Sequence, residues 1–230
     1  MDWNSFEEEL ERQAIVVFSL RDVARITAKP LGYTKIFLNR LVKRGRVARV
    51  ERGKYCIKGA SDYEVASNLV FPSYVSFLSA LAFHKLTTQI PVVIQVACKR
   101  QRKSAKFGGT RIEFVRLGEK AFFGFKRFGN AFVAEAEKAV VDGLYLPQKL
   151  PLAEAAAALK ELSAEKLCEH ADRLGSSVVK RRLGYLLERA GRQASFAPPK
   201  TTRYALLNPG LPAKGQKNRK WMLLVNEVLE

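Results

Sequence analysis

The sequence predicts an α+β protein, with an N-terminal winged helix-turn-helix domain followed by a larger α+β domain that combines a small sheet with several helices. Two short helical patterns separated by Pro30, a basic hairpin after them, and a strand block that precedes a helix block support this fold class. The 230 residues are 47% hydrophobic, enough to bury a core in each domain. The predicted domains span residues 1–59 and 60–230, and the second ends in an irregular arm over residues 196–230.

Capping and periodicity predict the two helices of the helix-turn-helix. Ser19 precedes an apolar pattern over residues 20–26 and is a good N-cap, because its hydroxyl can accept a hydrogen bond from the first turn. Pro30 disfavours continuation of this helix. A second helix is expected over residues 33–44, and its inward apolar stripe is formed by Phe37, Leu38 and Leu41.

A basic hairpin is predicted directly after the second helix. Residues 46–50 and 54–57 have the β-branched and aromatic content of strands, and Gly53 lies in the turn between them. A leading helix over residues 2–15 is expected to bury Phe6 and to turn its acidic residues outward. The order of these elements is that of a winged helix-turn-helix.

The charge of the chain indicates a polyanionic partner. Lys and Arg number 40 against 22 Asp and Glu, a formal net charge of +18. Residues 12–58 carry 13 basic side chains and only two acidic ones, Asp22 and Glu51. This asymmetry favours double-stranded DNA as the partner of the winged helix.

Specific residues of the winged helix are expected to contact DNA, with Asn39 suited to reading adenine. The candidates on and just after the second helix are Tyr33, Thr34, Lys35, Asn39, Lys43, Arg44 and Arg46. The candidates on the hairpin are Arg49, Arg52 and Lys54.

The second domain is predicted from its apolar patterns. Residues 65–83 are interpreted as two helices broken at Pro72, with the second helix beginning near Tyr74. Strands are expected over residues 91–97, 111–115, 121–125 and 131–134, and helices over residues 135–145, 152–162, 164–174 and 176–190. The C-terminal arm is expected to pack Trp221, Leu223 and Val225 on the body of the domain.

Two basic groups in the second domain are further candidates for nucleic-acid contacts. One is a loop over residues 99–106, for which a solvated hairpin tip is the alternative. The other is a cationic collar on the helix over residues 176–190, for which an ordinary surface is the alternative. The candidates are Lys99, Arg100, Arg102, Lys103, Lys106, Lys180, Arg181 and Arg182.

The spacing of the cysteines and the polar residues within the uncharged segment 65–83 predict a cytoplasmic protein without a metal or cofactor. The three cysteines are far apart and form no CxxC pair, which argues against a disulfide framework or a structural zinc site. The acidic N-terminal segment has the wrong charge for a secretory signal. Residues 65–83 contain Pro72 and five Ser or Asn side chains, so they are too polar for a membrane span.

Known catalytic motifs are absent from the sequence, so an enzyme is not expected. Walker A, GxGxxG and GxSxG motifs do not occur, and no Asp or Glu stands two residues before a Lys. Lys138 lies between Glu135 and Asp142 at the i−3 and i+4 positions, which is salt-bridge spacing on a helix.

Three segments of the second domain resemble AbiEi-type antitoxins. Residues 74–84, with Leu86, Thr87, Gln89 and Pro91, resemble the segment that opens the C-terminal domain of that family. Phe123-Gly124, then residues 137–139 with Asp142 and Tyr145, resemble the next conserved segment of that family, and residues 182–188 resemble its late helix. Lys85 departs from the small residue expected after His84.

The resemblance implies a transcriptional repressor that is the antitoxin of a type IV toxin–antitoxin, phage-defence system. Such proteins bind inverted repeats in their own promoter, as monomers or as DNA-induced oligomers. The implied functional partner is a nucleotidyltransferase-like toxin, which such antitoxins are thought to counter without a stable complex. The family also uses its C-terminal domain in cooperative DNA binding and in antitoxicity.

Two alternatives remain open at this stage. A basic protein-interaction module could neutralise a toxin directly by covering an acidic surface. An RNA-binding protein is the other alternative, because Phe123-Gly124-Phe125 partly matches the aromatic strand of an RNA-recognition motif. The RNA-binding alternative predicts that Phe123 and Phe125 are exposed, and burial of both rings would exclude that alternative.

Overall fold

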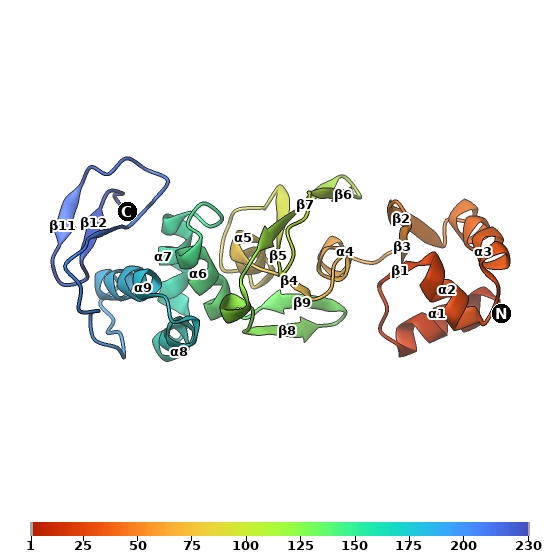
Figure 1. The fold of residues 1–230 in the computed structure, drawn as a ribbon, viewed down its shortest axis with the longest axis horizontal. Coiled ribbons are helices and arrows are strands. Elements are labelled where there is room, and N and C mark those ends of the chain that lie inside the picture. The colour runs from red at the N-terminus through yellow and green to blue at the C-terminus, as the bar shows by residue number, and fades with distance from the viewer. Residues whose placement is uncertain (1, 230) are drawn as a thin grey trace. The chain divides into compact units, whose positions relative to one another are not determined.

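The computed structural model describes residues 2–229 (Figure 1), and the chain divides into two compact units. The first unit comprises the chain up to residue 75 with residues 92–116 and 127–133, and the second comprises the remaining segments. The predicted boundary at residues 59 and 60 stays a prediction, and its outer ends, residues 1 and 230, lie outside the described residues. The mixed α+β class is confirmed.

The N-terminal part of the first unit is a winged helix-turn-helix, as predicted. Its elements are α1 (Trp3–Arg12), β1 (Val17–Ser19), α2 (Leu20–Thr27), α3 (Leu31–Lys43), β2 (Val47–Glu51) and β3 (Lys54–Ile57). The strands form an antiparallel sheet in the order β1-β3-β2. Its buried core consists of Phe6, Leu10, Phe18, Val23, Leu38, Leu41 and Val47.

Local sequence signals explain where α2 and α3 begin and end. The Ser19 hydroxyl accepts a hydrogen bond from the Asp22 amide at 3.3 Å, and the Asp22 carboxylate accepts one from the Ser19 amide at 2.8 Å. This capping box satisfies two amides at the start of α2. Pro30 is the N-cap of α3, so the helix begins two residues earlier than predicted. Gly45 follows α3 with a positive φ of 66°, as its sequence position indicates.

A second sheet follows the winged helix. After α4 (Asp62–Asn68) come β4 (Ser73–Val75), β5 (Val93–Cys98), β6 (Ala105–Phe107), β7 (Thr110–Arg116), β8 (Phe125–Phe128) and β9 (Ala131–Ala134). The strand order is β6-β7-β5-β4-β9-β8, in which β5 and β7 are parallel.

Two predictions for this region are corrected: the helix expected after Pro72 is present as α5 (Phe77–Phe83) but begins later, and a predicted strand is displaced. Tyr74 lies in β4 and not in a helix, because β4 pairs with β5 and places Tyr74 opposite Ala97. This long-range pairing overrides the helical spacing of the apolar residues. Residues 121–124 do not form a strand, because a 3₁₀ turn spans Glu119–Ala121 and Gly124 has a left-handed φ of 70°; β8 begins only at Phe125.

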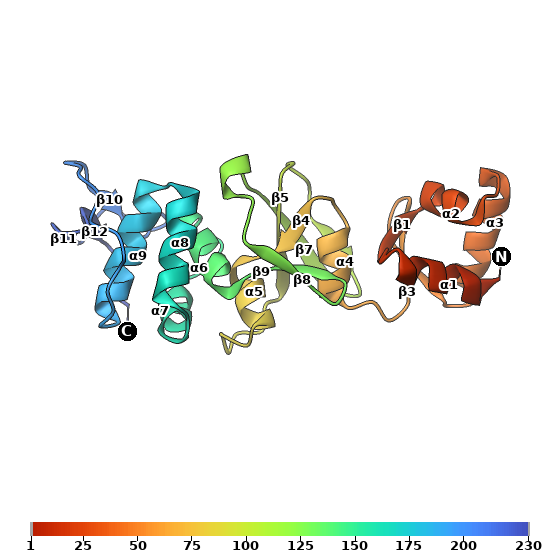
Figure 2. The ribbon, with the colours of Figure 1, turned by 90° about the horizontal axis from the view of Figure 1, so that it is seen from below.

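The second unit is mainly helical. It contains α5 (Phe77–Phe83), α6 (Ala136–Tyr145), α7 (Leu152–Glu161), α8 (Ala164–Leu174) and α9 (Ser177–Arg189). Helix α6 is central and packs against the other four helices, and Figure 2 shows α6, α8 and α9 side by side. The four helices predicted between residues 135 and 190 are confirmed.

The C-terminal arm is more regular than predicted. Strands β10 (Ala205–Leu206), β11 (Gln216–Asn218) and β12 (Leu223–Val225) form a small sheet in the order β10-β12-β11. Trp221 and Leu223 are buried as expected, whereas Val225 is half-buried. The strands are too short to give a sequence signal.

The second unit buries an ion pair in its interior. The Lys138 ammonium pairs with the Asp142 carboxylate, and both side chains are fully buried. The Ser76 hydroxyl donates a hydrogen bond to the same carboxylate at 2.8 Å. The Lys138 nitrogen also lies 4.7 Å from the centroid of the Phe123 ring. Burial lowers the pKa of Lys138, and the Asp142 charge opposes that effect.

Replacing Gly184 by Ala is expected to destabilise the second unit by about 1–3 kcal/mol. A Cβ at this position would overlap three carbon atoms of the buried Trp221 ring. This overlap outweighs the gain of about 1 kcal/mol that Ala gives over Gly within a helix. Chemical denaturation measures the change.

Gly32→Ala in α3 is the matched control for this prediction. Nothing lies within 4 Å of a Cβ at this helical position, so the free energy of unfolding should be unchanged or slightly raised. A Gly184→Ala variant as stable as the unmodified protein would contradict the close packing of Trp221 on α9.

Candidate nucleic-acid interface

Helix α3 presents a polar face opposite its buried face. Leu38 and Leu41 are buried against the core, while Lys35, Asn39 and Lys43 are exposed. The exposed residues recur at i+4 and i+8, which places them along one side of the helix. An exposed helix face with cations and an amide has the geometry and charge to enter the major groove of DNA.

Thr34 is a correction to the predicted set. Its side chain is fully buried, and its hydroxyl donates a hydrogen bond to the Pro30 carbonyl at 2.7 Å. Thr34 precedes the buried Leu38 and Leu41 by four and seven positions, so it lies on the inward face of α3. Thr34 therefore has no path to a base edge.

Two side chains on the same face were missed by the sequence prediction. Ile36 is 55% exposed, and Arg40 is exposed at the i+4 position from it. The sequence contains a signal for both residues, because Ile36 and Arg40 repeat the i, i+4 spacing of Lys35 and Asn39 one position later. The exposure of Ile36 does not follow from its residue type, because isoleucine is most often buried.

The remaining predicted residues near α3 lie on its flank and at its end. Tyr33 is half exposed, and its ring stacks on the ring of Phe37, with 6.4 Å between centroids. Arg44 and Arg46 are exposed, and the Arg46 guanidinium lies 5.9 Å from the centroid of the Trp3 ring. Their exposure leaves these side chains able to meet phosphates.

The tip of the wing carries two exposed cations. Arg52 and Gly53 form the turn between β2 and β3, and Gly53 has the positive φ of 78° that the turn requires. Arg49 is exposed on β2, and its Nε donates a hydrogen bond to the Glu51 carbonyl at 3.3 Å.

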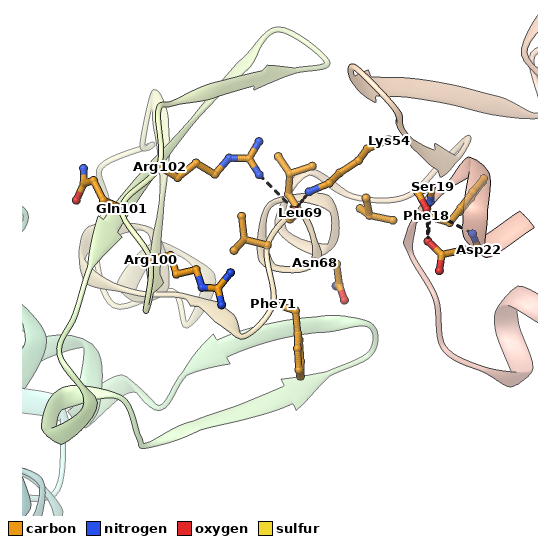
Figure 3. A pocket seen from close by; sticks show the side chains of 12 residues that line it. Phe18, Ser19, Asp22, Lys54, Asn68, Leu69, Phe71, Arg100, Gln101 and Arg102 are labelled. Atoms are coloured by element: carbon orange, nitrogen blue, oxygen red, sulfur yellow. Dashed lines mark hydrogen bonds between the residues drawn. The ribbon is translucent and has the colours of Figure 1, made fainter.

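The predicted DNA contacts of Lys54 and Arg102 are also corrected, because both side chains bind other groups within the first unit. Each pairs with the carboxylate of Glu51 and donates to the carbonyl of Leu69, and Figure 3 shows their approach to Leu69. The Arg102 guanidinium also lies 4.7 Å from the centroid of the Phe114 ring. Neither residue is retained as a DNA contact.

The loop after β5 keeps three exposed cations, Arg100, Lys103 and Lys106, while Lys99 is half-buried. Strand β6, which contains Lys106, packs beside β2 of the wing. A cavity of about 450 Å³ lies between the two regions, lined by Phe18, Leu69, Phe71 and Arg100 among others (Figure 3). The loop and the wing thus present exposed cations on the same compact unit.

The predicted collar on α9 is wrong for two of its three residues. Arg181 and Arg182 are buried and donate hydrogen bonds to backbone carbonyls. Arg181 reaches Arg203 at 2.9 Å, and Arg182 reaches Leu144 at 2.7 Å. Burial lowers the pKa of Arg182 to about 10, so the guanidinium is still protonated at neutral pH. Lys180 is half-buried and pairs with Asp172.

The aromatic segment of the RNA-binding alternative is only partly accessible. Phe123 is buried, with the Arg173 guanidinium 4.3 Å from its ring centroid. Phe125 is half-buried, so the criterion of burial for both rings is met only at Phe123. A buried ring cannot stack on a base.

Residues 2–229 show neither a metal-binding cluster nor a membrane-spanning helix. Within that range, no group of three or more His, Cys, Asp and Glu side chains has an arrangement suited to holding a metal ion. None of the helices described there is both long enough and apolar enough to cross a bilayer.

Comparison with known proteins supports the winged helix and the overall fold. The crystal structure of the RV2827C protein from Mycobacterium tuberculosis is similar to this chain, with a TM-score of 0.58 and 14% identity over 96% of this chain and 89% of that one. At this identity the similarity shows the fold alone. No curated protein matches the chain.

A family model described as "Transcriptional regulator, AbiEi antitoxin" matches residues 5–58. The match covers the winged helix, whereas the segments that carried the sequence resemblance lie beyond residue 73. Residues 5–58, which form the winged helix, therefore match the AbiEi antitoxin family of transcriptional regulators that the resemblance predicts.

Proposed function

We propose that this chain is a sequence-specific, double-stranded DNA-binding repressor and the antitoxin of a type IV toxin–antitoxin system. It controls its own operon by binding inverted repeats in the promoter. The observation that carries the proposal is the exposed polar face of α3, with Lys35 and Asn39, on a winged helix of a transcriptional regulator family.

In the proposed complex, α3 lies in the major groove. The Asn39 amide can pair with the N6 and N7 positions of adenine, and Lys35 can donate to guanine acceptors. Arg49 and Arg52 contact phosphates beside the groove, and Arg100, Lys103 and Lys106 extend the contact along the backbone. The phosphate contacts set the register of α3, and the base contacts set the sequence.

An inverted repeat presents two equivalent half-sites, so two chains bind with two-fold symmetry. The chain would then be a monomer that assembles on its operator. Its functional partner is a nucleotidyltransferase-like toxin, countered without a stable complex.

Gel-shift titration of the DNA upstream of the gene over a range of salt concentrations tests this proposal. If about eight phosphates are engaged, the logarithm of the binding constant should fall with the logarithm of salt at a slope near −7. A reporter under the same upstream DNA should be repressed by the protein. A salt-sensitive one-to-one complex with the toxin, without any promoter shift, would favour direct neutralisation instead.

A further inference from the structure

Ile36 occupies the centre of the exposed face of α3. Its side chain is 55% exposed, whereas Leu38 on the opposite side is 2% exposed. Gly32 precedes Ile36 by one turn, and Asn39 and Arg40 follow it at i+3 and i+4. These three neighbours and Tyr33 at i−3 are exposed, so the isoleucine lies on a solvent-facing surface where packing requires no apolar residue.

Charge decides which partner fits this apolar side chain. The cations Lys35, Arg40 and Lys43 surround Ile36 on the helix face, and within the described residues of α3 no acidic side chain offsets them. The complementary partner is a polyanion, which in this fold is DNA. The apolar group that a major groove offers is the C5-methyl of thymine.

The local backbone leaves room for close approach. Nothing lies within 4 Å of a Cβ built at Gly32, so the surface one turn before Ile36 is open. A base edge can therefore reach the isoleucine without displacing a neighbouring side chain.

We infer that Ile36 contacts a thymine methyl group in the major groove and so determines part of the operator sequence. This inference rests on the proposed function of the chain. It adds a side chain that recognises a methyl group, where the proposed function uses hydrogen-bonding groups only.

Replacing thymine by uracil in the upstream fragment removes the methyl group and leaves base pairing intact. Burying one methyl group contributes about 0.8 kcal/mol, equivalent to an affinity change of about four-fold. The unmodified protein should therefore bind uracil DNA about four-fold more weakly for each methyl contact, or about sixteen-fold when two half-sites are filled. Ile36→Ala should bind thymine DNA more weakly by the same factor and should not respond to uracil.

Val42→Ala is the matched control, because Val42 is also an exposed apolar residue of α3 but lies six positions beyond Ile36, near the C-terminal end of the helix. This variant should keep the uracil response. Both substitutions are at exposed positions, and equal melting temperatures will show that the fold is kept.

Two results would overturn the inference while leaving the proposed function in place. One is unchanged affinity of the unmodified protein for uracil DNA, with the preference for the upstream fragment kept. The other is the same uracil response in Ile36→Ala, which would assign the effect to DNA shape or to another residue. Loss of any preference for the upstream thymine DNA over a shuffled duplex would overturn both.

Discussion

Asp142→Ala is expected to lower the free energy of unfolding of the second unit by about 3–5 kcal/mol. The substitution leaves the fully buried Lys138 ammonium without its carboxylate partner. It also removes the acceptor of the Ser76 hydroxyl. The loss comes mainly from a buried ammonium that no longer meets the Asp142 carboxylate, because breaking one side of a buried pair costs more than replacing the whole pair.

Urea denaturation followed by far-UV circular dichroism measures this change. The double variant Lys138→Met, Asp142→Leu should recover most of the lost stability, because it removes both charges and fills a similar volume. Lys180→Ala breaks a half-exposed ion pair in the same unit and should cost only about 0.2–1 kcal/mol. An Asp142→Ala variant within 1 kcal/mol of the unmodified protein would contradict the buried pair.

Asn39→Ala is expected to weaken binding to the upstream DNA by roughly 5- to 150-fold, equivalent to the 1–3 kcal/mol of a two-point contact with adenine. Binding to random-sequence DNA should be nearly unchanged, because the amide carries no charge and adds little to phosphate attraction. Fluorescence anisotropy with both duplexes measures the two affinities.

Arg52→Ala is the contrasting variant at the tip of the wing. It should weaken binding to both duplexes by a similar factor and reduce the salt slope by about 1, because one phosphate contact is lost. Equal losses on the two duplexes for Asn39→Ala would remove the base-reading role of that residue.

The winged helix was predictable because its signals are local. Ser19 caps α2, Pro30 separates the helices and Gly53 allows the turn of the wing, so each boundary depends on residues within one or two turns. The small strands were not predictable. Strand β1 has three residues, and its pairing partner Tyr55 lies 37 positions beyond Phe18.

The errors at the candidate site arise from long-range contacts. Arg182 is buried because the Leu144 carbonyl, 38 residues earlier in the chain, accepts its hydrogen bond. Arg102 is engaged because Glu51, 51 residues earlier, lies beside it. A basic side chain in a sequence shows its charge but not the acceptor that it meets after folding. Thr34 differs, since its spacing of four and seven positions from Leu38 and Leu41 already places it on the inward face of α3.

Competition between the duplex upstream of the gene and a shuffled duplex of the same composition tests the central proposal most directly. At physiological salt, a sequence-specific repressor should prefer the upstream duplex by about a thousand-fold or more. The preference should fall in Lys35→Ala and Asn39→Ala. Equal affinity of the unmodified protein for the two duplexes would contradict the account.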